Sequence, residues 1–382
     1  MNNEVIDLTS LSEDRYERQK RIIWWDQDVL GDAKVLVVGA GTLGNEICKN
    51  LALIGVGEIW VVDNDTVEMV NLNRCVLMRE DDIGRGKVDA IVKHIKELNK
   101  TIKVKGLFGD VIWDLGAGFY RNFDVVILGL DNREARMYVN KYCYLVGTPL
   151  IDGAIEGLRG RVQVIDPPHT SCYECTFSEK DYELLSVKYS CPGLPIEDLT
   201  EGKVAMVATT SSIIAGIQVQ EAVLLMHKKK GRQSSLAGRE LRFDGNTNEI
   251  FIYEIPFREG CLGHFYLEEV IKVDSGVDST LSELIGEIKD KTNEIGGITV
   301  TIDREIAYTG SCVKCGSKKD ILKPVSLIKK GEAFCPECGE MLGFDTSGEL
   351  RGDDRVLKRL GVPESHILTA YVNGKTYYVE LQ

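Results

Sequence analysis

The chain has 382 residues, a formal net charge of −13, and 43% apolar and 27% charged residues. This composition is typical of a folded globular protein, and the length allows two or three modules. The negative charge argues against a general attraction to nucleic acid or to an anionic membrane. The first residues lack the basic and apolar stretches of a signal peptide, and no apolar segment is long enough to span a bilayer. We therefore expect a cytoplasmic protein with reduced cysteines.

Short apolar segments alternate with segments of helical periodicity over the first two-thirds of the chain. We predict strands over 34–39, 58–63, 124–130, 148–153 and 161–165, and helices over 42–54, 87–98, 133–145 and 204–226. Because most of these strands are apolar without period-two alternation, they are typical of a parallel sheet that is buried on both faces. The predicted fold class is therefore α/β, with a Rossmann-like, mostly parallel sheet and helices on both faces. Residues 242–256 add two strands around an Asp-Gly-Asn turn.

The regular alternation stops between about 172 and 203, where the sequence has no clear periodicity. We interpret this stretch as a long functional loop that crosses the surface. The composition changes again after His264, and we place a domain boundary near residue 266. The expected domains are residues 1–265 and a small α+β C-terminal module of residues 266–382, which contains an amphipathic helix over 281–292, a zinc ribbon over about 308–342 and a terminal β-hairpin at Asn373-Gly374.

A glycine-rich motif follows the first predicted strand. Gly39, Gly41 and Gly44 lie between this strand and the first helix, and Asp63 ends the second strand. Glycines at this spacing let the backbone approach a phosphate at the helix N-terminus, and the acid can hold ribose hydroxyls. The motif by itself fits any dinucleotide-binding domain, so an NAD-dependent oxidoreductase is the first alternative.

Acids, amides and cations follow the ends of the predicted strands. They are Asp65, Asn71, Arg74 and Lys87 after the second strand and Asp131, Asn132 and Arg136 after the third, with Arg15 and Arg18 near the start. Hydride transfer does not need this set of charges. A site that cleaves a triphosphate needs cations on the phosphates and an acid for magnesium. The set therefore favours ATP over NAD.

In this order, from Arg15 to about His264, these motifs resemble those of the family that contains ubiquitin-activating enzymes and the bacterial adenylyltransferases that act on sulfur-carrier proteins. The resemblance implies an adenylating enzyme that uses ATP and Mg²⁺. It implies that Gly41 lies under the nucleotide, that Asp63 binds the ribose, that Asn71, Arg74 and Lys87 contact the phosphates, and that Asp131 holds magnesium. Gly39, Gly44, Asp65 and Asn132 complete the expected nucleotide site.

The resemblance also concerns subunits. In this family, an arginine at the position of Arg18 reaches into the ATP site of a neighbouring subunit, which implies a homodimer. The sequence departs from the family pattern at Cys75, where glutamine commonly follows the arginine. This departure puts one polar contact in doubt and leaves the expected reaction unchanged.

Two pairs of metal-ligand residues border the irregular loop and the end of the larger domain. Cys172 and Cys175 form the first pair, and Cys261 and His264 form the second. Three thiolates and one imidazole make a closed tetrahedral zinc site. The resembling family holds zinc with pairs at these two places, usually with four cysteines, and zinc tolerates the histidine. The alternative is that Cys261 and His264 are incidental and that this zinc is lost.

A second set of cysteines lies in the C-terminal module. Cys312, Cys315, Cys335 and Cys338 form two Cys-x-x-Cys pairs with nineteen residues between them, which is the signature of a zinc ribbon. We therefore expect a second structural Zn²⁺; the alternative is four free cysteines. Because the chain is acidic and the ribbon lacks interleaved aromatic and basic residues, a protein partner is expected rather than nucleic acid.

Cys191 lies in the irregular loop, sixteen residues after Cys175. In the ubiquitin-activating enzymes that the chain resembles, the thioester-forming cysteine stands on this loop, shortly after the first zinc pair. A helix N-terminus or a cation such as Lys188 lowers the pKa of a thiol and raises its thiolate fraction. We therefore expect Cys191 to be a nucleophile; the alternative is a turn without chemistry. Cys48 and Cys143 are expected to be packing residues in helices.

The sequence thus predicts an enzyme that adenylates the C-terminal glycine carboxylate of a ubiquitin-like protein and then holds this modifier as a thioester on Cys191. Arg18, Arg74 and Lys87 are expected to stabilise charge on the phosphates. The C-terminal module is expected to recruit the modifier or the conjugating enzyme that receives it. The chain resembles a compact prokaryotic version of these enzymes. The alternatives are a sulfur-carrier adenylyltransferase without a thioester step, an NAD-binding oxidoreductase, and a zinc scaffold without catalysis.

Overall fold

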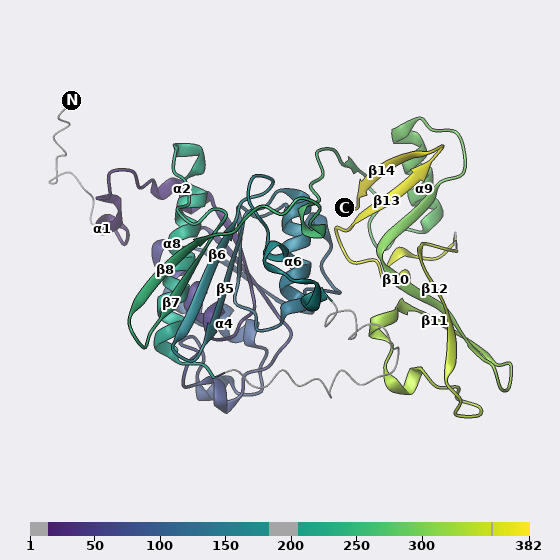
Figure 1. Cartoon of the computed structure of the whole chain (residues 1–382), viewed down its shortest axis with the longest axis horizontal. Coiled ribbons are helices and arrows are strands. Elements are labelled where there is room, and N and C mark those ends of the chain that lie inside the picture. The colour runs from purple at the N-terminus through teal and green to yellow at the C-terminus, as the bar shows by residue number, and fades with distance from the viewer. Residues whose placement is uncertain (1–13, 183–204, 353) are drawn as a thin grey trace.

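The computed structural model describes residues 14–182, 205–352 and 354–382. Within them, the chain forms an eight-stranded sheet and a six-stranded sheet (Figure 1). The strands of the first sheet are β1 (Lys34–Val38), β2 (Glu58–Asp63), β3 (Lys103–Phe108), β4 (Val125–Leu128), β5 (Leu150–Glu156), β6 (Arg159–Ile165), β7 (Arg239–Asp244) and β8 (Glu249–Glu254). The helices of this part are α1 (Glu17–Lys20), α2 (Gln27–Asp32), α3 (Thr42–Ile54), α4 (Lys87–Leu98), α5 (Ala117–Tyr120), α6 (Arg133–Val146) and α8 (Ala208–Met226).

The strand order of the first sheet is β3-β2-β1-β4-β5-β6-β7-β8. The strands from β3 to β5 pair in parallel, and those from β5 to β8 pair antiparallel. This confirms the predicted α/β class with a mostly parallel sheet. The chain leaves β1 toward β2 and later returns to β4 on the other side of β1. In open α/β sheets, such a reversal creates a ligand crevice outside the carboxyl ends of the strands.

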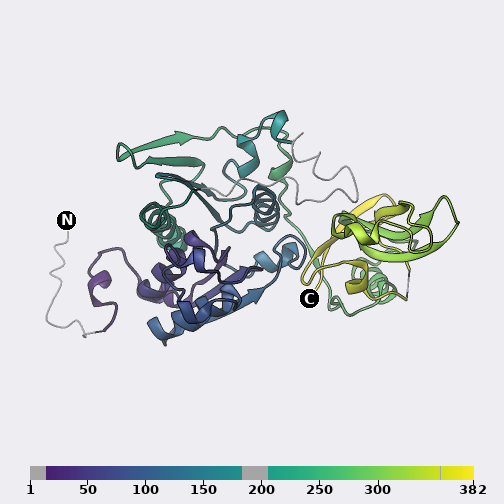
Figure 2. The ribbon, with the colours of Figure 1, turned by 90° about the horizontal axis from the view of Figure 1, so that it is seen from below.

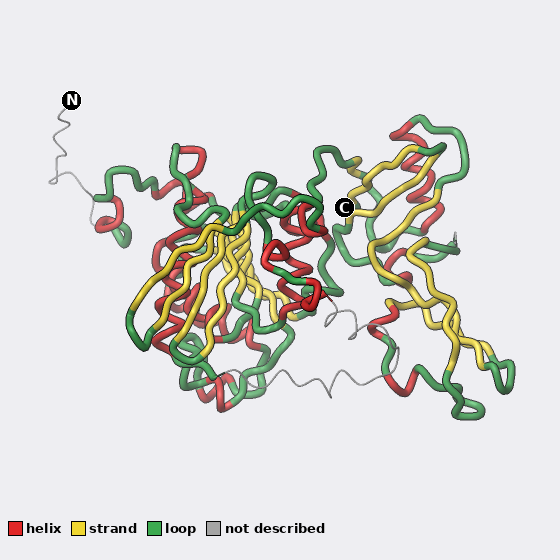
Figure 3. Tube along the Cα trace, viewed as in Figure 1, coloured by secondary structure: helices red, strands yellow, loops and turns green. Residues whose placement is uncertain are grey.

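Helices cover both faces of the central strands, which appear yellow between red helices in Figure 3. Alternate side chains of a strand point to opposite faces. Val35 and Val37 belong to a core with residues of α3, α4 and α8, whereas Leu36 and Val38 belong to a core with residues of α5 and α6. Because both faces of these strands are buried, no alternate set of side chains faces water, and polar residues are not needed at every second position. The absence of period-two alternation in the sequence follows from this burial.

The edges of the sheet differ from its centre. The edge strand β3 was not predicted from the sequence, since only Val104 among its six residues is buried and two of the others are exposed lysines. At the opposite edge, all six residues of β8 are exposed, including the apolar residues Ile250, Phe251, Ile252 and Tyr253. Exposed apolar side chains that gather on one strand often mark a surface that contacts another protein.

The second sheet contains β9 (Ile271–Lys272), β10 (Thr299–Cys312), β11 (Lys318–Pro324), β12 (Leu342–Glu349), β13 (Ile367–Val372) and β14 (Lys375–Glu380). Its order is β11-β10-β13-β14-β9, and β12 also pairs with β10. Helix α9 (Leu281–Thr292) begins with a capping box between Thr280 and Glu283 and buries Leu284 and Ile288 in the core of this part. Asn373 and Gly374 both have positive φ, as the tight turn between β13 and β14 requires.

The second sheet stands beside the first sheet rather than stacked on it (Figure 2). Backbone hydrogen bonds join the two parts from Gly116 to Glu364 and from Gly118 to Ser365. Nζ of Lys141, on α6, lies 2.6 Å from the carboxylate of Asp303, which is on β10 of the second sheet. Among the described residues, every helix is too short or too polar to cross a membrane.

Candidate active site

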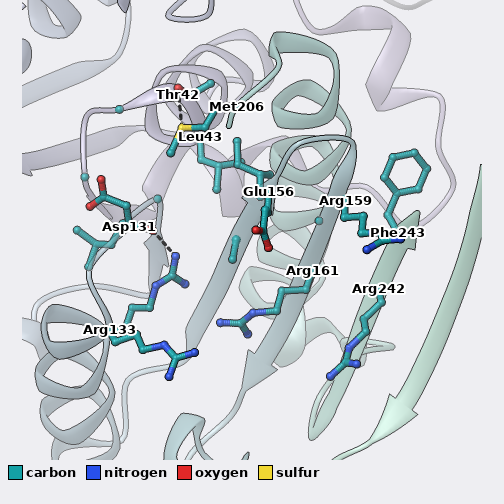
Figure 4. Close-up of a pocket in the computed structure, with 18 of the residues that line it drawn as sticks. Thr42, Leu43, Asp131, Arg133, Glu156, Arg159, Arg161, Met206, Arg242 and Phe243 are labelled. Atoms are coloured by element: carbon teal, nitrogen blue, oxygen red, sulfur yellow. Dashed lines mark hydrogen bonds between the residues drawn. The ribbon is translucent and has the colours of Figure 1, made fainter. Parts of the chain in front are cut away.

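A cleft of about 860 Å³ opens at the carboxyl ends of β1, β2 and β4 and continues over β6, β7 and β8 (Figure 4). Residues of the expected nucleotide site line its first part: Gly39, Gly41, Asp63, Asp65, Asn71, Arg74, Lys87 and Asp131. Residues of the antiparallel strands line its second part, among them Arg159, Arg161, Arg242, Phe251 and Tyr253. The cleft therefore joins the crevice at the strand-order reversal to a second surface on the sheet.

The glycines of the turn between β1 and α3 let neighbouring backbone segments pack closely against one another. Gly39 has a φ of 95°, and a Cβ at this position would lie 2.7 Å from the carbonyl oxygen of Gly129. A Cβ on Gly44 would lie 1.8 Å from the carbonyl oxygen of Gly39, so Gly44 lets α3 pack on the turn. Gly41 is the N-cap of α3, and no described atom lies within 4 Å of where its Cβ would be. The uncapped N–H groups at the start of this 13-residue helix thus border open space, where they favour a phosphate.

Asp63, at the end of β2, braces this turn, and Asp65, just after β2, positions a lysine. Asp63 accepts hydrogen bonds from the amides of Ala40, at 2.6 Å, and of Asp65, at 2.7 Å. Burial raises the pKa of Asp63 above its ordinary value, although these two amides oppose the shift. Asp65 forms an ion pair with Lys87, at 2.7 Å between Oδ2 and Nζ. Burial opposes the charge on Lys87, but Asp65 and Asp63 hold the pKa of this lysine above its ordinary value. Lys87 is therefore a fixed cation.

Asn71 and Arg74 form another wall of the cleft. Asn71 is buried and accepts a backbone hydrogen bond through Oδ1. The guanidinium of Arg74 donates to the carbonyl oxygen of Val70 and to Oδ1 of Asn73. Its buried Nε has no hydrogen-bond partner within the described residues. A buried donor without a partner costs free energy, which a hydrogen bond to an anionic ligand would recover. The adjacent Cys75 is buried, and this burial raises the pKa of its thiol, so it stays neutral.

The remaining predicted residues of the nucleotide site take different places. Asp131 lines the cleft and is exposed. Asn132 is the N-cap of α6, where it accepts a hydrogen bond from the amide of Glu134 at 2.9 Å, and it is not part of the cleft lining. Arg18 lies on α1, its side chain is 85% exposed, and it is outside the cleft of its own chain. Figure 1 shows α1 standing away from the sheet.

A chain of ion pairs crosses the second part of the cleft, and sequence reasoning missed it. Arg136 and Arg161 share the buried carboxylate of Asp152, with Arg161 Nη2 at 2.7 Å from Oδ2. Glu240, also buried, lies 3.3 Å from Arg161 and 2.6 Å from Nε of Arg242. The available signal was the period-two spacing of charged residues in β6 and β7, which puts them on one face of the sheet.

The irregular loop borders the same cleft at both of its described ends. Asp181, before the gap, and Met206, after it, line the cleft. The hydroxyl of Thr42, in the first turn of α3, lies 3.8 Å from the sulfur of Met206. Cys191 lies between these ends, outside the described residues. Both described ends of the loop therefore border the cleft, and the second end lies beside the glycine turn.

The first predicted metal cluster comes together in space. Cys172, Cys175, Cys261 and His264 place one ligand atom each within 4.8 Å of one another. The sulfurs of Cys172 and Cys261 are 3.7 Å apart, and Nε2 of His264 is 3.1 Å from the sulfur of Cys175. Ligands at about 2.3 Å from a tetrahedral zinc lie about 3.8 Å apart. The four residues therefore fit a zinc ion that joins the start of the loop to the end of the larger domain.

The second predicted cluster, Cys312, Cys315, Cys335 and Cys338, also brings its sulfurs within 4.8 Å of one another. The sulfurs of Cys312 and Cys338 are 3.4 Å apart, and those of Cys315 and Cys335 are 3.5 Å apart. The first pair lies at the end of β10 and the second just before β12. Four thiolates at these distances again fit a tetrahedral zinc.

Zinc content tests both clusters. We expect about two zinc ions per purified chain, and about one after either Cys172→Ser or Cys312→Ser, because a three-ligand remnant holds structural zinc poorly. His264→Cys should keep both ions, since it completes a four-thiolate set. The measurement is elemental analysis after removal of loosely bound metal, with Cys75→Ser as the matched control outside both clusters. Unchanged zinc in the Cys312→Ser variant would show that the second cluster is not a metal site.

These features define a class of protein. An uncapped helix start, a fixed lysine and an arginine with a free buried donor gather at the strand-order reversal of an α/β sheet. These features are those of a nucleotide-binding domain. Its site has more cations than the binding of a dinucleotide requires, and its cleft continues onto an exposed surface of the sheet.

The comparisons with known proteins give the family. A sequence profile of the ThiF family matches residues 16–263, and the chain belongs to this family. It is 38% identical over 149 residues to SUMO-activating enzyme subunit 2 of Dictyostelium discoideum, covering 39% of this chain and 22% of that protein. It is 38% identical over 165 residues to the NEDD8-activating enzyme E1 catalytic subunit of Schizosaccharomyces pombe, covering 42% of this chain and 36% of that protein. The chain thus spans well under half the length of these relatives.

Solved structures share the fold. Escherichia coli MccB, in a crystal structure with ATP, superposes with a TM-score of 0.56 and 23% identity, over 67% of this chain and 75% of that one. At this identity, the likeness supports the fold alone. Together, the profile and the relatives confirm the family that the motif order indicated, whereas the roles of individual residues remain predictions.

Proposed function

We propose that this chain is an ATP-dependent activating enzyme for a ubiquitin-like protein, whose C-terminal carboxylate it adenylates. One observation carries the proposal: the nucleotide crevice is continuous with a cleft that runs across β6 and β7 to the exposed apolar strand β8. A small second substrate would not need this surface, whereas the tail and body of a protein substrate would cover it. The names of the related SUMO- and NEDD8-activating enzymes support the same reaction class.

In the proposed first step, a carboxylate oxygen of the modifier attacks the α-phosphorus of ATP, the bond to the bridging oxygen breaks, and pyrophosphate leaves. The N-terminus of α3, Arg74 and Lys87 would stabilise the charge that builds on the phosphates. Lys87 is already held by Asp65, so little reorganisation is needed when the substrate arrives. Asp131, exposed at the cleft, would hold Mg²⁺, which neutralises phosphate charge when it is bound.

In the proposed second step, the thiolate of Cys191 attacks the acyl carbonyl of the adenylate, a C–S bond forms, and AMP leaves. This step is supported by the two described ends of the loop that carries Cys191, since Asp181 and Met206 both line this cleft. Among the described residues, Cys75 lines the cleft but does not suit this role, because it is buried and its thiol has a raised pKa. Cys172 and Cys175 belong to the first metal cluster. The product thioester would pass to a conjugating enzyme.

Two further roles belong to the proposal. Arg18 would serve the ATP site of a second copy of the chain in a homodimer, which its 85% exposure and its distance from its own cleft permit. The C-terminal module, with its own zinc ribbon, would recruit the modifier or the conjugating enzyme. Its contacts with α6, the helix that follows Asp131, join it to the nucleotide-binding domain.

The thioester step has a direct test. When the enzyme is incubated with ATP, Mg²⁺ and a ubiquitin-like protein of the same genome, we expect an adduct that reductant removes. Cys191→Ala should abolish the adduct while ATP–pyrophosphate exchange continues, because the adenylate forms first. Cys75→Ala is the matched control and should keep the adduct. Gel electrophoresis with and without reductant, followed by intact-mass measurement, gives the result.

The same experiment distinguishes the proposed function from its main alternative, a sulfur-carrier adenylyltransferase. A sulfur-carrier adenylyltransferase would give exchange and an adenylate without any reductant-sensitive adduct, in the wild type as well as in Cys191→Ala. This outcome would overturn the thioester step and leave adenylation standing.

A further inference from the structure

The second part of the cleft contains a row of four residues that crosses the sheet. Strand pairing sets Ala154 on β5 opposite Arg161 on β6, Arg161 opposite Arg242 on β7, and Arg242 opposite Phe251 on β8. Directly opposed residues of neighbouring strands share a face, and all four of these residues line the cleft. We call Ala154, Arg161, Arg242 and Phe251 the arginine row. It leads from the nucleotide end of the cleft to the exposed edge strand.

The charges beneath the row leave a surplus. Among the described residues, Arg136, Arg161 and Arg242 form ion pairs with only two carboxylates, those of Asp152 and Glu240, and both carboxylates are buried. Three guanidinium groups and two carboxylates carry a formal charge of +1. The surplus lies at the outer end, because the side chain of Arg242 is 64% exposed and only its Nε contacts Glu240 in this network.

Aromatic rings help to hold the two guanidinium groups of the row in place. The guanidinium carbon of Arg161 lies 5.6 Å from the centre of the Tyr173 ring, and that of Arg242 lies 5.2 Å from the centre of the Tyr253 ring. In Figure 4, the side chains of Arg133, Arg161 and Arg242 stand one after another across the cleft. Cations that are already positioned lose little conformational entropy when they bind an anionic group.

A second row limits how much negative charge the cleft accepts. Nearer the outer ends of the same strands lie Glu156, Arg159, Asp244 and Glu249, which strand pairing also sets opposite one another. Arg159 is paired with Asp244 at 3.0 Å, so this outer row has a net negative charge. A strongly acidic tail would be repelled there. One acidic side chain directly over Arg161 and Arg242 would not.

We propose that Arg161 and Arg242 bind a single acidic side chain in the C-terminal tail of the modifier, about three to four residues before its terminal carboxylate. The inference rests on the proposed function, since it names a feature of that substrate. The position of the acidic side chain in the tail follows from the strand order. Asp131, just after β4, marks the nucleotide end of the cleft, and β6 and β7 lie two and three strands away from β4. At about 4.8 Å between strands and about 3.3 Å per extended residue, roughly 10 to 14 Å correspond to roughly three to four residues.

Labelled short peptides that end in Gly-Gly test this recognition on the full chain. The peptides differ only in carrying Glu, Gln or Lys at one position, which is moved from the third to the sixth residue before the terminus. By fluorescence anisotropy, we expect the best Glu peptide to bind about tenfold more tightly than its Lys counterpart, with Gln between them. Arg242→Gln should bring the three affinities together, and Arg242→Glu should reverse their order. Arg239→Glu, on the opposite face of β7, is the matched control and should keep the preference.

Each outcome decides the inference. Equal affinities, a preference for Lys, or no binding by any peptide would overturn it. A Glu preference that Arg242→Gln does not change would also overturn it, because the recognition would then lie elsewhere. ATP–pyrophosphate exchange with the same peptides separates this inference from the proposed function. Charge-selective binding without exchange would contradict adenylation and leave the recognition by Arg161 and Arg242 standing.

Discussion

Replacing Lys87 with alanine is expected to lower ATP–pyrophosphate exchange by about 10²–10³-fold, because one fixed cation at a developing charge contributes an effect of this size. Lys87 lines the cleft, its side chain is only 12% exposed, and Asp65 positions its ammonium group. The loss should appear mainly in kcat/KM, measured with saturating modifier and varied ATP.

A matched lysine controls for the change of net charge. Lys103 is exposed on the edge strand β3, away from the cleft, and Lys103→Ala should keep exchange within about twofold of the wild type, as expected for a surface change away from special features. The thermal midpoint of Lys87→Ala should stay close to that of the wild type, because the partner Asp65 is largely exposed. Exchange that Lys87→Ala leaves intact would show that the cleft does not bind a triphosphate as described.

Replacing Asp152 with alanine is expected to lower the free energy of unfolding of the nucleotide-binding domain by about 3–5 kcal/mol, because it leaves two buried or half-buried guanidinium groups without their shared carboxylate. Asp152 is fully buried and contacts both Arg136 and Arg161. Urea unfolding followed by tryptophan fluorescence gives the value. The four tryptophans lie between residues 24 and 113, so the signal reports mainly this domain, although Trp113 also contacts Arg304 of the C-terminal module.

Asp244 provides the matched control. It makes a comparable ion pair with Arg159, but that arginine is 71% exposed. Asp244→Ala should cost less than about 1 kcal/mol, as surface ion pairs generally do. A similar small cost for Asp152→Ala would contradict the role of the buried network as the support of the arginine row.

Much of the first sheet could be predicted because its elements have local causes. Helices α3 and α4 and strand β2 have the predicted bounds, since each combines an apolar period with a turn at both ends. The edge strand β3 could not be predicted from its own residues, because only Val104 is buried and pairing with β2 keeps it in place. The change to antiparallel pairing at β6 is likewise a property of the assembled sheet.

The site divides in the same way. Motif order identified Gly39, Asp63 and Asp131 at the carboxyl ends of β1, β2 and β4, because these residues lie at or just after the ends of their strands. It did not show that Asn132 caps α6, since a helix N-cap and a ligand contact use the same residue types. The arginine row was missed because Arg161 and Arg242 are 81 positions apart and meet only through the pairing of β6 with β7.

The central claim is that the carboxylate of a protein tail is adenylated in this cleft. The most direct test is exchange of labelled pyrophosphate into ATP by the purified chain, with each ubiquitin-like protein of its genome added in turn. We predict that one of them stimulates exchange, and that deletion of its last glycine or amidation of its terminal carboxylate abolishes the stimulation. Exchange that does not depend on any such carboxylate, or tight NAD binding with no exchange at all, would contradict the account.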